Sequence, residues 1–442
     1  MRIILLFFVL TIMNSAFADT MLETAKQLRE DALQSTRAWD IVESLTTEVG
    51  PRLAGTDADK QAVAWAQAML KDAGFDRVWL EPVKFPVWLR HHEKARVVAP
   101  YPQSLRITAL GYSGSTNGEL TAEIVAFDSL ADLESVSRAS VEGKIVFIDQ
   151  STDRNIDGTG YGKVVPVRYM GGKLAKEKGA VAVLIRSVGT DSHRFPHTGS
   201  SLRHDNALPA AALSAPDADQ LGRMLKRNKT ITIALDINVE TKAGGQSWNV
   251  IGQLDGREKP DEVILVSGHL DSWDLGTGAI DDGAGVAITT AAAQLIGALP
   301  QRPRRSVRVV LFANEEQGLW GGNAYAKAHK DELDLHYYAS ESDFGAGLIW
   351  QFDVADESFL DLVMPLLSPL GVKRGAAASG GGPDIKALMG AGVSVFRLKQ
   401  NGLDYFDYHH TADDTLDKIN PESLKQNVAA WAVVTYLLAE RK

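Results

Sequence analysis

Residues 266 to 285 read VSGHLDSWDLGTGAIDDGAG and directly follow the apolar run EVILV. A short apolar run of this kind is typical of a buried strand, and the small, apolar stretch from 283 to 299 is typical of a buried helix. Between them lie four aspartates and a single histidine. This concentration of acids is unusual for a turn that only reverses the chain, so the stretch predicts both a strand-to-helix unit and a chemical site.

The same alternation continues on both sides of this stretch. Apolar runs resembling buried strands recur before and after it, with helical patterns between them: SWNVIGQL, SVRVVLFA, LHYYASES and GVSVFRLKQ. A last helix is predicted from 423 to 440. Repeating strand and helix patterns favour an α/β fold, here a doubly wound and largely parallel sheet with helices on both faces.

The N-terminal half has a different pattern. Residues 21 to 75 contain helical periodicity and predict a pair of entry helices, with Gly74 as a C-terminal stop. Residues 83 to 99 predict a β-hairpin or strand pair. Short strands and two helices between 113 and 241 predict a small α/β domain inserted into a larger one. The predicted catalytic domain therefore consists of residues 19 to 112 and 242 to 442.

The N-terminal segment and the net charge restrict the location and the partners of the protein. The first eighteen residues combine Arg2, an apolar run and small residues at Ala16 and Ala18, a pattern typical of a signal peptide cleaved after Ala18. The alternative is an uncleaved membrane anchor. An anchor needs a run of about 20 apolar residues, and the run from Ile3 to Met13 is shorter than that. We therefore expect an exported protein, periplasmic or secreted, with no membrane attachment after cleavage. The net charge of −10 argues against nucleic acid as a partner.

The absence of cysteine restricts the chemistry further. With no cysteine in the chain, disulfides, thiolate catalysis and cysteine-ligated zinc are excluded. Any metal must be held by imidazole and carboxylate groups, which suit zinc and similar ions.

Polar residues gather where the predicted strands end. In open α/β sheets ligands bind at the carboxyl ends of the strands, so these are the side chains expected to meet. Two histidines and three carboxylates can hold two ions if one carboxylate bridges them at a metal spacing of about 3.5 to 4 Å. The strand ends and following loops supply these candidates: His269, Asp271, Asp281, Asp282, Asn314, Glu315, Glu316, Glu341, Asp343, His409, His410, Asp413 and Asp414.

The order of these motifs resembles the co-catalytic dizinc aminopeptidase family, and within it the carboxypeptidase Q branch. The resemblance covers the chain from about Asn249 to the C-terminus, and the inserted segment is more loosely similar to that branch's protease-associated domain. The usual Ala-Glu-Glu is Asn314-Glu315-Glu316 here, which changes no ligand. The motifs that carry it are GHLDSWDLGTGAIDDGAG, NEEQG, ESD, HHTADDT and NVAAWAVVTY.

The resemblance implies a role for each of these residues. It implies two zinc ions per chain, His269 and Asp343 belonging to one, Glu316 and His410 to the other, with Asp281 shared. It places Asp271 where it can orient His269. It also makes Glu315 the general base that takes a proton from the activated water.

The activity that the resemblance implies is that of a zinc metallopeptidase. The expected substrates are short peptides or dipeptides with a free N-terminus, and a homodimer is also implied. One alternative is a single-zinc acyltransferase of the glutaminyl cyclase type, which shares the fold class. The other is a catalytically silent, peptidase-like binding protein.

Several neighbouring residues have simpler explanations. Asp282 is expected to cap the following helix, Asp414 to fix the His410 loop by hydrogen bonds, and Asp274 to be solvated. The histidine-containing loop from 191 to 204 is predicted to be a solvated or lid loop.

Three further residues are each open to two assignments. His409 either donates to the oxyanion or is a second-layer imidazole. Asp384, in a glycine-rich run, either meets a substrate amine or belongs to a plain loop. Trp273 either lines the pocket or braces it.

Overall fold

A large central sheet organises the chain. The computed structural model describes residues 20–227, 230–378 and 380–442, so the predicted signal peptide lies outside the described residues. The fold is mixed α/β, with an 11-stranded sheet and a separate 3-stranded sheet. No helix in the described ranges is long and apolar enough to cross a membrane.

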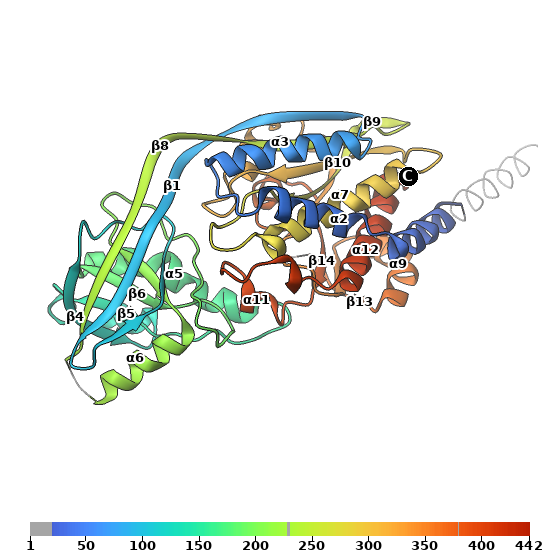
Figure 1. Cartoon of the computed structure of the whole chain (residues 1–442). Helices are drawn as coiled ribbons and strands as arrows, with labels where there is room; N and C mark the ends of the chain where they lie inside the picture. The colour runs from blue at the N-terminus through green and yellow to red at the C-terminus, as the bar shows by residue number, and fades with distance from the viewer. Residues whose placement is uncertain (1–19, 228–229, 379) are drawn as a thin grey trace, which may run out of the picture.

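Two very long strands join the two bodies of the molecule. Strands β1 (Arg77–Ala99) and β8 (Thr232–Leu254) pair antiparallel along their whole length and arch from one body to the other (Figure 1). The hairpin predicted within 83 to 99 is therefore wrong. Pro82 and Pro86 do not interrupt β1, because it lies at the edge of the main sheet, where a missing N–H is tolerated.

The first body holds the parallel part of the sheet. Strand β9 (Lys259–His269) pairs in parallel with β10 (Arg305–Phe312) and with β11 (His336–Glu341). Strand β8 joins β10 antiparallel, so the sheet is mixed at this edge and less parallel than expected.

Helices cover both faces of this sheet, as a doubly wound fold requires. One face packs into the largest apolar core and the other into a smaller one around Tyr325 and Leu388. The first face is covered by residues 20–34 and by α2 (Arg37–Ser44), α3 (Asp57–Asp72), α7 (Ala284–Gly297), α9 (Glu357–Leu367) and α12 (Pro421–Glu440). The second face is covered by α8 (Trp320–Ala328) and α10 (Lys386–Gly390).

One predicted strand of the main sheet lies elsewhere. Strand β14 (Phe396–Gln400) pairs antiparallel with β12 (Ile349–Val354), which also pairs with β13 (Lys373–Arg374). A single bridge between Ala339 and Val395 connects this region to β11. The prediction that GVSVFRLKQ continues the main parallel sheet is confirmed only at this parallel bridge, because β14 itself pairs with β12, a partner that the sequence pattern did not reveal.

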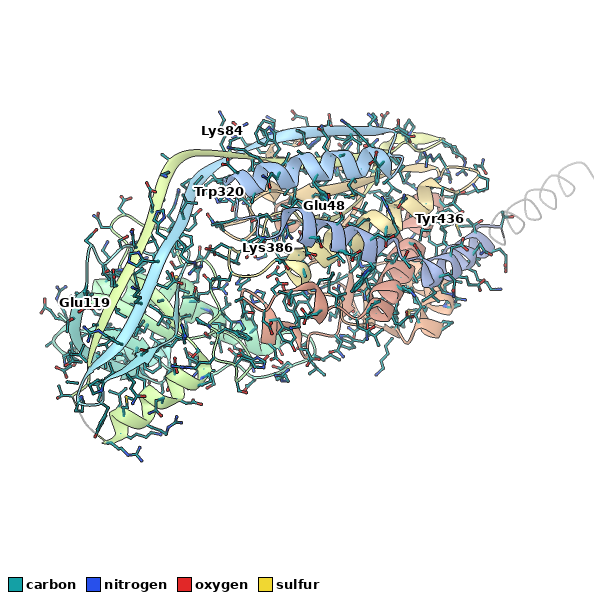
Figure 2. The ribbon with its side chains drawn as sticks, viewed as in Figure 1. Glu48, Lys84, Glu119, Trp320, Lys386 and Tyr436 are labelled. Carbon is teal, nitrogen blue, oxygen red and sulfur yellow. The ribbon has the colours of Figure 1, made fainter. Side chains whose placement is uncertain are left out.

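The second body is built on the far ends of β1 and β8 and has its own apolar cores. Glu119 lies in this body and Tyr436 in the first one (Figure 2). Strands β4 to β7 are mutually parallel, and β3 joins β7 antiparallel. Its elements are β2 (Gln103–Leu105), β3 (Ile107–Ala109), β4 (Leu120–Phe127), α4 (Leu130–Ser135), β5 (Ile145–Ile148), α5 (Thr159–Glu177), β6 (Ala182–Arg186), β7 (Ala210–Leu213) and α6 (Ala215–Arg227).

Candidate active site

The carboxyl ends of three neighbouring parallel strands supply most of the site. His269 ends β9, Glu315 and Glu316 follow β10, and Asp343 follows β11. Asp281 lies in the irregular turn (Ala279–Gly283) that leads into α7. His410 comes from a loop after the short helix α11 (Tyr405–Tyr408).

Asp281 lies between two sets of side chains. Its Oδ1 is 3.1 Å from His269 Nε2, and its Oδ2 is 3.2 Å from His410 Nε2. Asp343 Oδ1 lies 3.6 Å from the same nitrogen of His269, and Glu316 Oε2 lies 2.9 Å from that of His410. The structure thus brings together the five residues predicted as ligands in the two predicted groups, with one carboxylate between them.

The electrostatics of this cluster call for bound cations. Burial raises the pKa of Glu316 to about 7, with Asp281 adding to the rise against the opposing effect of His410. Asp281 Oδ2 and Glu316 Oε1 are buried without a hydrogen-bond partner in the described part of the chain. Buried acidic oxygens without donors are costly unless a cation satisfies them. Imidazole and carboxylate donors fit zinc, so the residues present fit a metal centre.

The ring orientation of His269 leaves one nitrogen free for an ion. Its Nδ1 lies 3.0 Å from the backbone carbonyl oxygen of Asp271, to which an N–H at Nδ1 donates. Nε2 faces Asp281 and Asp343, so with the proton on Nδ1 its lone pair is available to a cation held between these side chains.

The carboxylate of Asp271 has a different position from the one predicted. Its nearest oxygen lies 3.7 Å from His269 Nδ1, beyond hydrogen-bond distance. Instead Oδ1 accepts the backbone N–H of Glu315 at 3.0 Å, and Oδ2 that of Glu316 at 3.4 Å. Asp271 therefore orients His269 through its carbonyl, while its side chain holds the turn that carries the two glutamates.

His410 is oriented by the second body. Its Nδ1 lies 3.3 Å from the carbonyl oxygen of Thr198, and the Thr198 N–H donates to the His410 carbonyl at 3.0 Å. The ring of Trp273 packs edge-on against the imidazole, with centroids 5.8 Å apart, and does not line the cavity beside the site. Of the two assignments left open for Trp273, the structure favours bracing.

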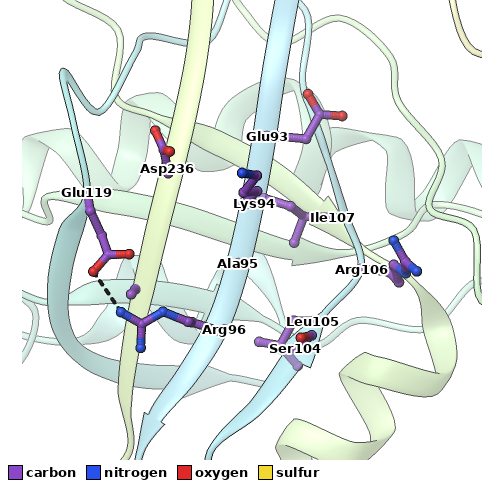
Figure 3. Close-up of a pocket in the computed structure, with 11 residues that line it drawn as sticks. Glu93, Lys94, Ala95, Arg96, Ser104, Leu105, Arg106, Ile107, Glu119 and Asp236 are labelled. Carbon is purple, nitrogen blue, oxygen red and sulfur yellow. Dashed lines mark hydrogen bonds and ion pairs between the residues drawn. The ribbon is translucent and has the colours of Figure 1, made fainter.

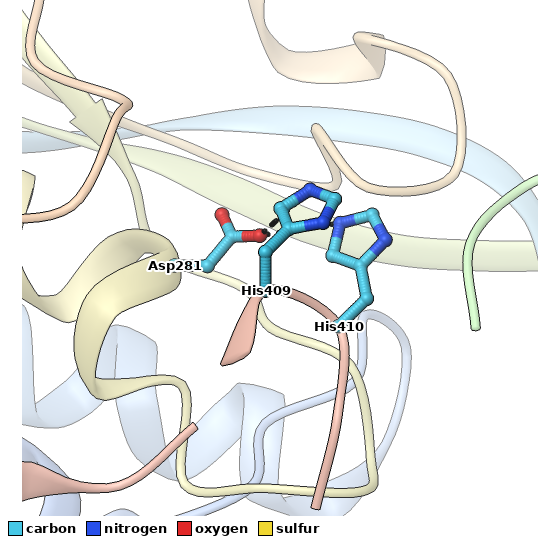
Figure 4. Close-up of side chains that lie close together, drawn as sticks. All are labelled: Asp281, His409 and His410. Carbon is cyan, nitrogen blue, oxygen red and sulfur yellow. Dashed lines mark ion pairs between the residues drawn. The ribbon is translucent and has the colours of Figure 1, made fainter. Parts of the chain in front are cut away.

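His409 stacks on His410 with ring centroids 3.5 Å apart. Its Nε2 lies 3.5 Å from Asp281 Oδ2, and Figure 4 shows the three side chains together. Burial lowers the pKa of His409 well below its ordinary value, and the neighbouring His410 lowers it further. His409 is thus a neutral imidazole at the cavity wall, a position compatible with either assignment proposed from the sequence.

The loop from 191 to 204 is packed in its second half, so the prediction of a solvated or lid loop is wrong there, whereas residues 192–194 are exposed. His197 is buried, with Nδ1 2.7 Å from the His409 carbonyl oxygen and Nε2 2.6 Å from Asp191 Oδ1. Ser200 Oγ donates to the Glu316 carbonyl at 2.8 Å. The contacts to His409 and Glu316 join residues more than a hundred positions apart, which no local pattern in the sequence indicates.

Three further aspartates around the site have structural roles. Asp282 accepts the N–H of His269 and that of Gly285, both at 3.0 Å, so it caps α7 as predicted and also holds the end of β9. Asp414 accepts the Ile280 N–H at 2.7 Å, which fixes the turn before Asp281. Asp274 is not simply solvated, because both of its oxygens accept hydrogen bonds from Arg90.

Asp384 lies behind the cavity wall. It is buried, with Oδ1 accepting the Gly322 N–H at 3.1 Å, and its neighbour Pro383 lines the cavity in its place. Burial raises the pKa of Asp384 to about 7. This position favours the structural assignment of Asp384 over contact with a substrate amine.

A cavity of about 460 Å³ opens beside the cluster and lies between the two bodies. Glu315 lines it and is half-buried, and burial raises the pKa of this carboxyl well above its ordinary value. Tyr161, Arg168 and Ser200 of the second body also line it. The sequence did not single out Tyr161 and Arg168, which lie on a helix with no motif of its own, and it noted Ser200 only as part of the loop from 191 to 204.

A second cavity of about 460 Å³ lies on the second body, far along the β1 and β8 ribbon (Figure 3). It is lined by charges of both signs, and Arg96 and Glu119 form an ion pair at 2.7 Å there. None of the histidines brought together in the first cavity lines it. This second cavity therefore lacks the histidine and carboxylate cluster of the first one.

Comparison with known proteins agrees with this geometry. Residues 249–435 match the model of Peptidase family M28. The chain is 36% identical to carboxypeptidase Q of Mus musculus over 91% of this chain and 86% of that protein. The crystal structure of a peptidase M28 precursor from Shewanella amazonensis SB2B is 52% identical, with a TM-score of 0.93, and covers 96% of this chain and 98% of that one.

A more distant structure shares the fold alone. The zinc aminopeptidase BSAP from Bacillus subtilis is 20% identical, with a TM-score of 0.68, over 92% of this chain and 95% of that one. The family match, the extended identity to carboxypeptidase Q and the shared architecture all lead to one assignment: the chain belongs to peptidase family M28.

Proposed function

We propose that this peptidase is an exported zinc enzyme that holds two zinc ions and hydrolyses short peptides or dipeptides with a free N-terminus. The observation that carries the two-ion proposal is the position of Asp281, with one oxygen toward His269 and the other toward His410. A carboxylate shared in this way suits a pair of ions. In this proposal His269 and Asp343 hold one ion, and Glu316 and His410 the other.

The chain's own residues have separate parts in the proposed reaction. When bound, zinc supplies Lewis-acid activation of a water molecule and of the scissile carbonyl. Glu315 takes the proton from the attacking water and returns it to the departing amine. Its position at the cavity wall and the backbone hydrogen bond from Glu315 to Asp271 support this assignment.

The remaining expectations also belong to this proposal. Residues 1–18 act as a cleaved signal, the second body is a protease-associated domain, and the chain forms a homodimer. The carboxypeptidase and aminopeptidase names of the relatives support an enzyme acting at peptide ends. The single-zinc acyltransferase and silent binding protein are the less favoured alternatives, because all five ligands and Glu315 are present.

The test compares wild type with Glu315→Gln after zinc loading. Substrates are a dipeptide, a tripeptide and their N-acetylated forms. Because general-base catalysis contributes about 10² to 10⁴-fold, we expect kcat to fall by that factor with zinc content unchanged at two per chain. Glu43→Gln, an exposed glutamate on α2, is the matched control and should keep full activity.

Each part of the proposal has its own contrary outcome. A variant at position 315 that retains full kcat refutes the base assignment. Equal hydrolysis of acetylated and free peptides refutes the requirement for a free N-terminus. One zinc per fully active chain refutes the two-ion centre.

A further inference from the structure

Arg168 is a buried cation at the wall of the active-site cavity. It lies on α5 of the second body and is 9% exposed. Its Nη1 is 3.4 Å from His410 Nδ1, and its guanidinium carbon is 5.6 Å from the centre of the Tyr161 ring. A Cβ on Gly199 would lie 2.4 Å from that carbon, so the backbone of Gly199 packs directly against the guanidinium. The side chain is held in place from three sides.

Arg168 has no acidic partner, unlike a comparable arginine of the same body. Within the described ranges no carboxylate oxygen lies within 4.0 Å of it, and its Nε is buried without a hydrogen-bond partner. By contrast, Arg186, which is also largely buried, pairs with Asp149 at 2.6 Å. A buried cation without a counter-charge is unfavourable unless an anion reaches it from outside.

We propose that Arg168 binds the α-carboxylate of the substrate, when the residue that follows the scissile bond is the C-terminal one. This inference rests on the proposed function. Arg168 touches the outer nitrogen of His410, whose inner nitrogen faces the acid cluster. The guanidinium is therefore about one residue from the reaction centre, and consecutive Cα atoms are about 3.8 Å apart. Its planar fork matches a carboxylate with two parallel hydrogen bonds.

The other cations of the cavity are less suited to this contact. Lys386, which is labelled in Figure 2, is exposed, and Arg397 is half-buried. Within the described residues, neither forms a hydrogen bond or ion pair with the histidines of the cluster. They add positive potential at the cavity, whereas Arg168 provides the fixed contact.

The position of Arg168 also sets a length limit. Each additional residue moves the carboxylate about 3.3 to 3.6 Å farther along an extended chain, beyond a direct hydrogen bond with a fixed guanidinium. Arg168 thus acts as a specificity-determining residue, which favours substrates whose carboxylate follows the scissile bond by one residue.

The experiment measures kcat/KM for Ala-Ala and for its C-terminal amide, with wild type, Arg168→Met and Arg168→Lys. A charge-assisted contact predicts a 10- to 100-fold loss for the acid in Arg168→Met, mainly through KM, and less than a threefold loss for the amide. Arg168→Lys should recover part of the loss. The control is Arg397→Met, which should leave the ratio of acid to amide within threefold of wild type.

A second measurement separates this proposal from the proposed function. Calorimetric binding of Ala-Ala and its amide to Glu315→Gln, with and without Arg168→Met, needs no hydrolysis. Acid-selective binding that depends on Arg168 supports the Arg168 proposal. If wild type cleaves no peptide, the proposed function is overturned, but this binding result still supports the Arg168 proposal. Equal losses for acid and amide, or zinc loss in Arg168→Met, would show that Arg168 only supports His410 and would overturn the proposal.

Discussion

Arg52 provides a direct test of how the loops around the site are held together. Its side chain is fully buried and donates only to backbone carbonyls. Nε donates to Leu270 at 2.5 Å, Nη1 to Thr277 at 2.7 Å and Nη2 to Gly278 at 2.8 Å, with a longer bond from Nη1 to Gly50 at 3.3 Å. One guanidinium therefore ties the end of β9 to the turn that precedes Asp281.

The expected cost of removing this guanidinium follows from its bonds. Hydrogen bonds to charged groups contribute about 1.5 to 3 kcal/mol each, but three bonds from one group are not additive. Each buried carbonyl that is left without its donor costs about 1 to 3 kcal/mol. We expect Arg52→Met to lower the free energy of unfolding by about 4 kcal/mol. Arg52→Lys should cost nearly as much, because an ammonium lacks the fork that reaches three carbonyls at once.

Thermal and urea unfolding of the zinc-loaded protein measure this loss. At about 2 °C per kcal/mol for a large domain, Arg52→Met should lower Tm by about 8 °C. The matched control is Arg77→Met, which removes an exposed ion pair with Asp255 and should cost less than about 1 kcal/mol. If Arg52→Met unfolds within about 1 kcal/mol of wild type, the carbonyl bonds do not hold these loops and the reasoning is wrong.

Three further predictions concern the packing and protonation of other groups. Gly285→Ala should lower the free energy of unfolding by about 2 to 3 kcal/mol, because a Cβ there would lie 1.8 Å from the Ser342 carbonyl oxygen. Gly172→Ala is the control: a Cβ there would meet no atom within 4 Å, so thermal unfolding should show a neutral or stabilising effect. Burial lowers the pKa of His336 to about 4, so the unfolded chain binds more protons than the folded one between about pH 6.5 and 4. The free energy of unfolding should therefore fall by about 3 kcal/mol as the pH drops through that range. His336→Asn should reduce this pH dependence, measured as Tm against pH. His197→Gln should lower zinc occupancy under limiting metal, measured by elemental analysis, whereas the exposed His193→Gln should not; equal occupancy in both variants would contradict a positioning role for this loop.

The sequence was informative about the site because of a general property of parallel sheets. His269, Glu316 and Asp343 each follow a strand of the same parallel group, and the carboxyl ends of such strands meet at one edge. The prediction that these side chains lie together thus needed only the strand pattern and the direction of the chain. The assignment of Asp282 as a cap followed from its position before a helix in the same way.

Contacts between the two bodies could not be predicted in this way. Arg168 and His410 are 242 positions apart in the sequence, and no motif contains both of them. Whether they meet depends on the course of β1 and β8, whose register shifts near Phe85 and Arg90 accompany the bend of the ribbon. The sequence pattern showed neither the length of these strands nor their curvature.

The sequence by itself determined the family, the α/β alternation and the residues able to hold metal, because periodicity, strand ends and donor chemistry are local properties. Only the tertiary structure decided that Thr198 and Arg168 reach the site, that Asp271 orients His269 through its carbonyl, and that Asp384 lies behind the wall. These outcomes depend on the packing of distant segments against one another, which is set by the shape of the whole chain and not by any short stretch of it.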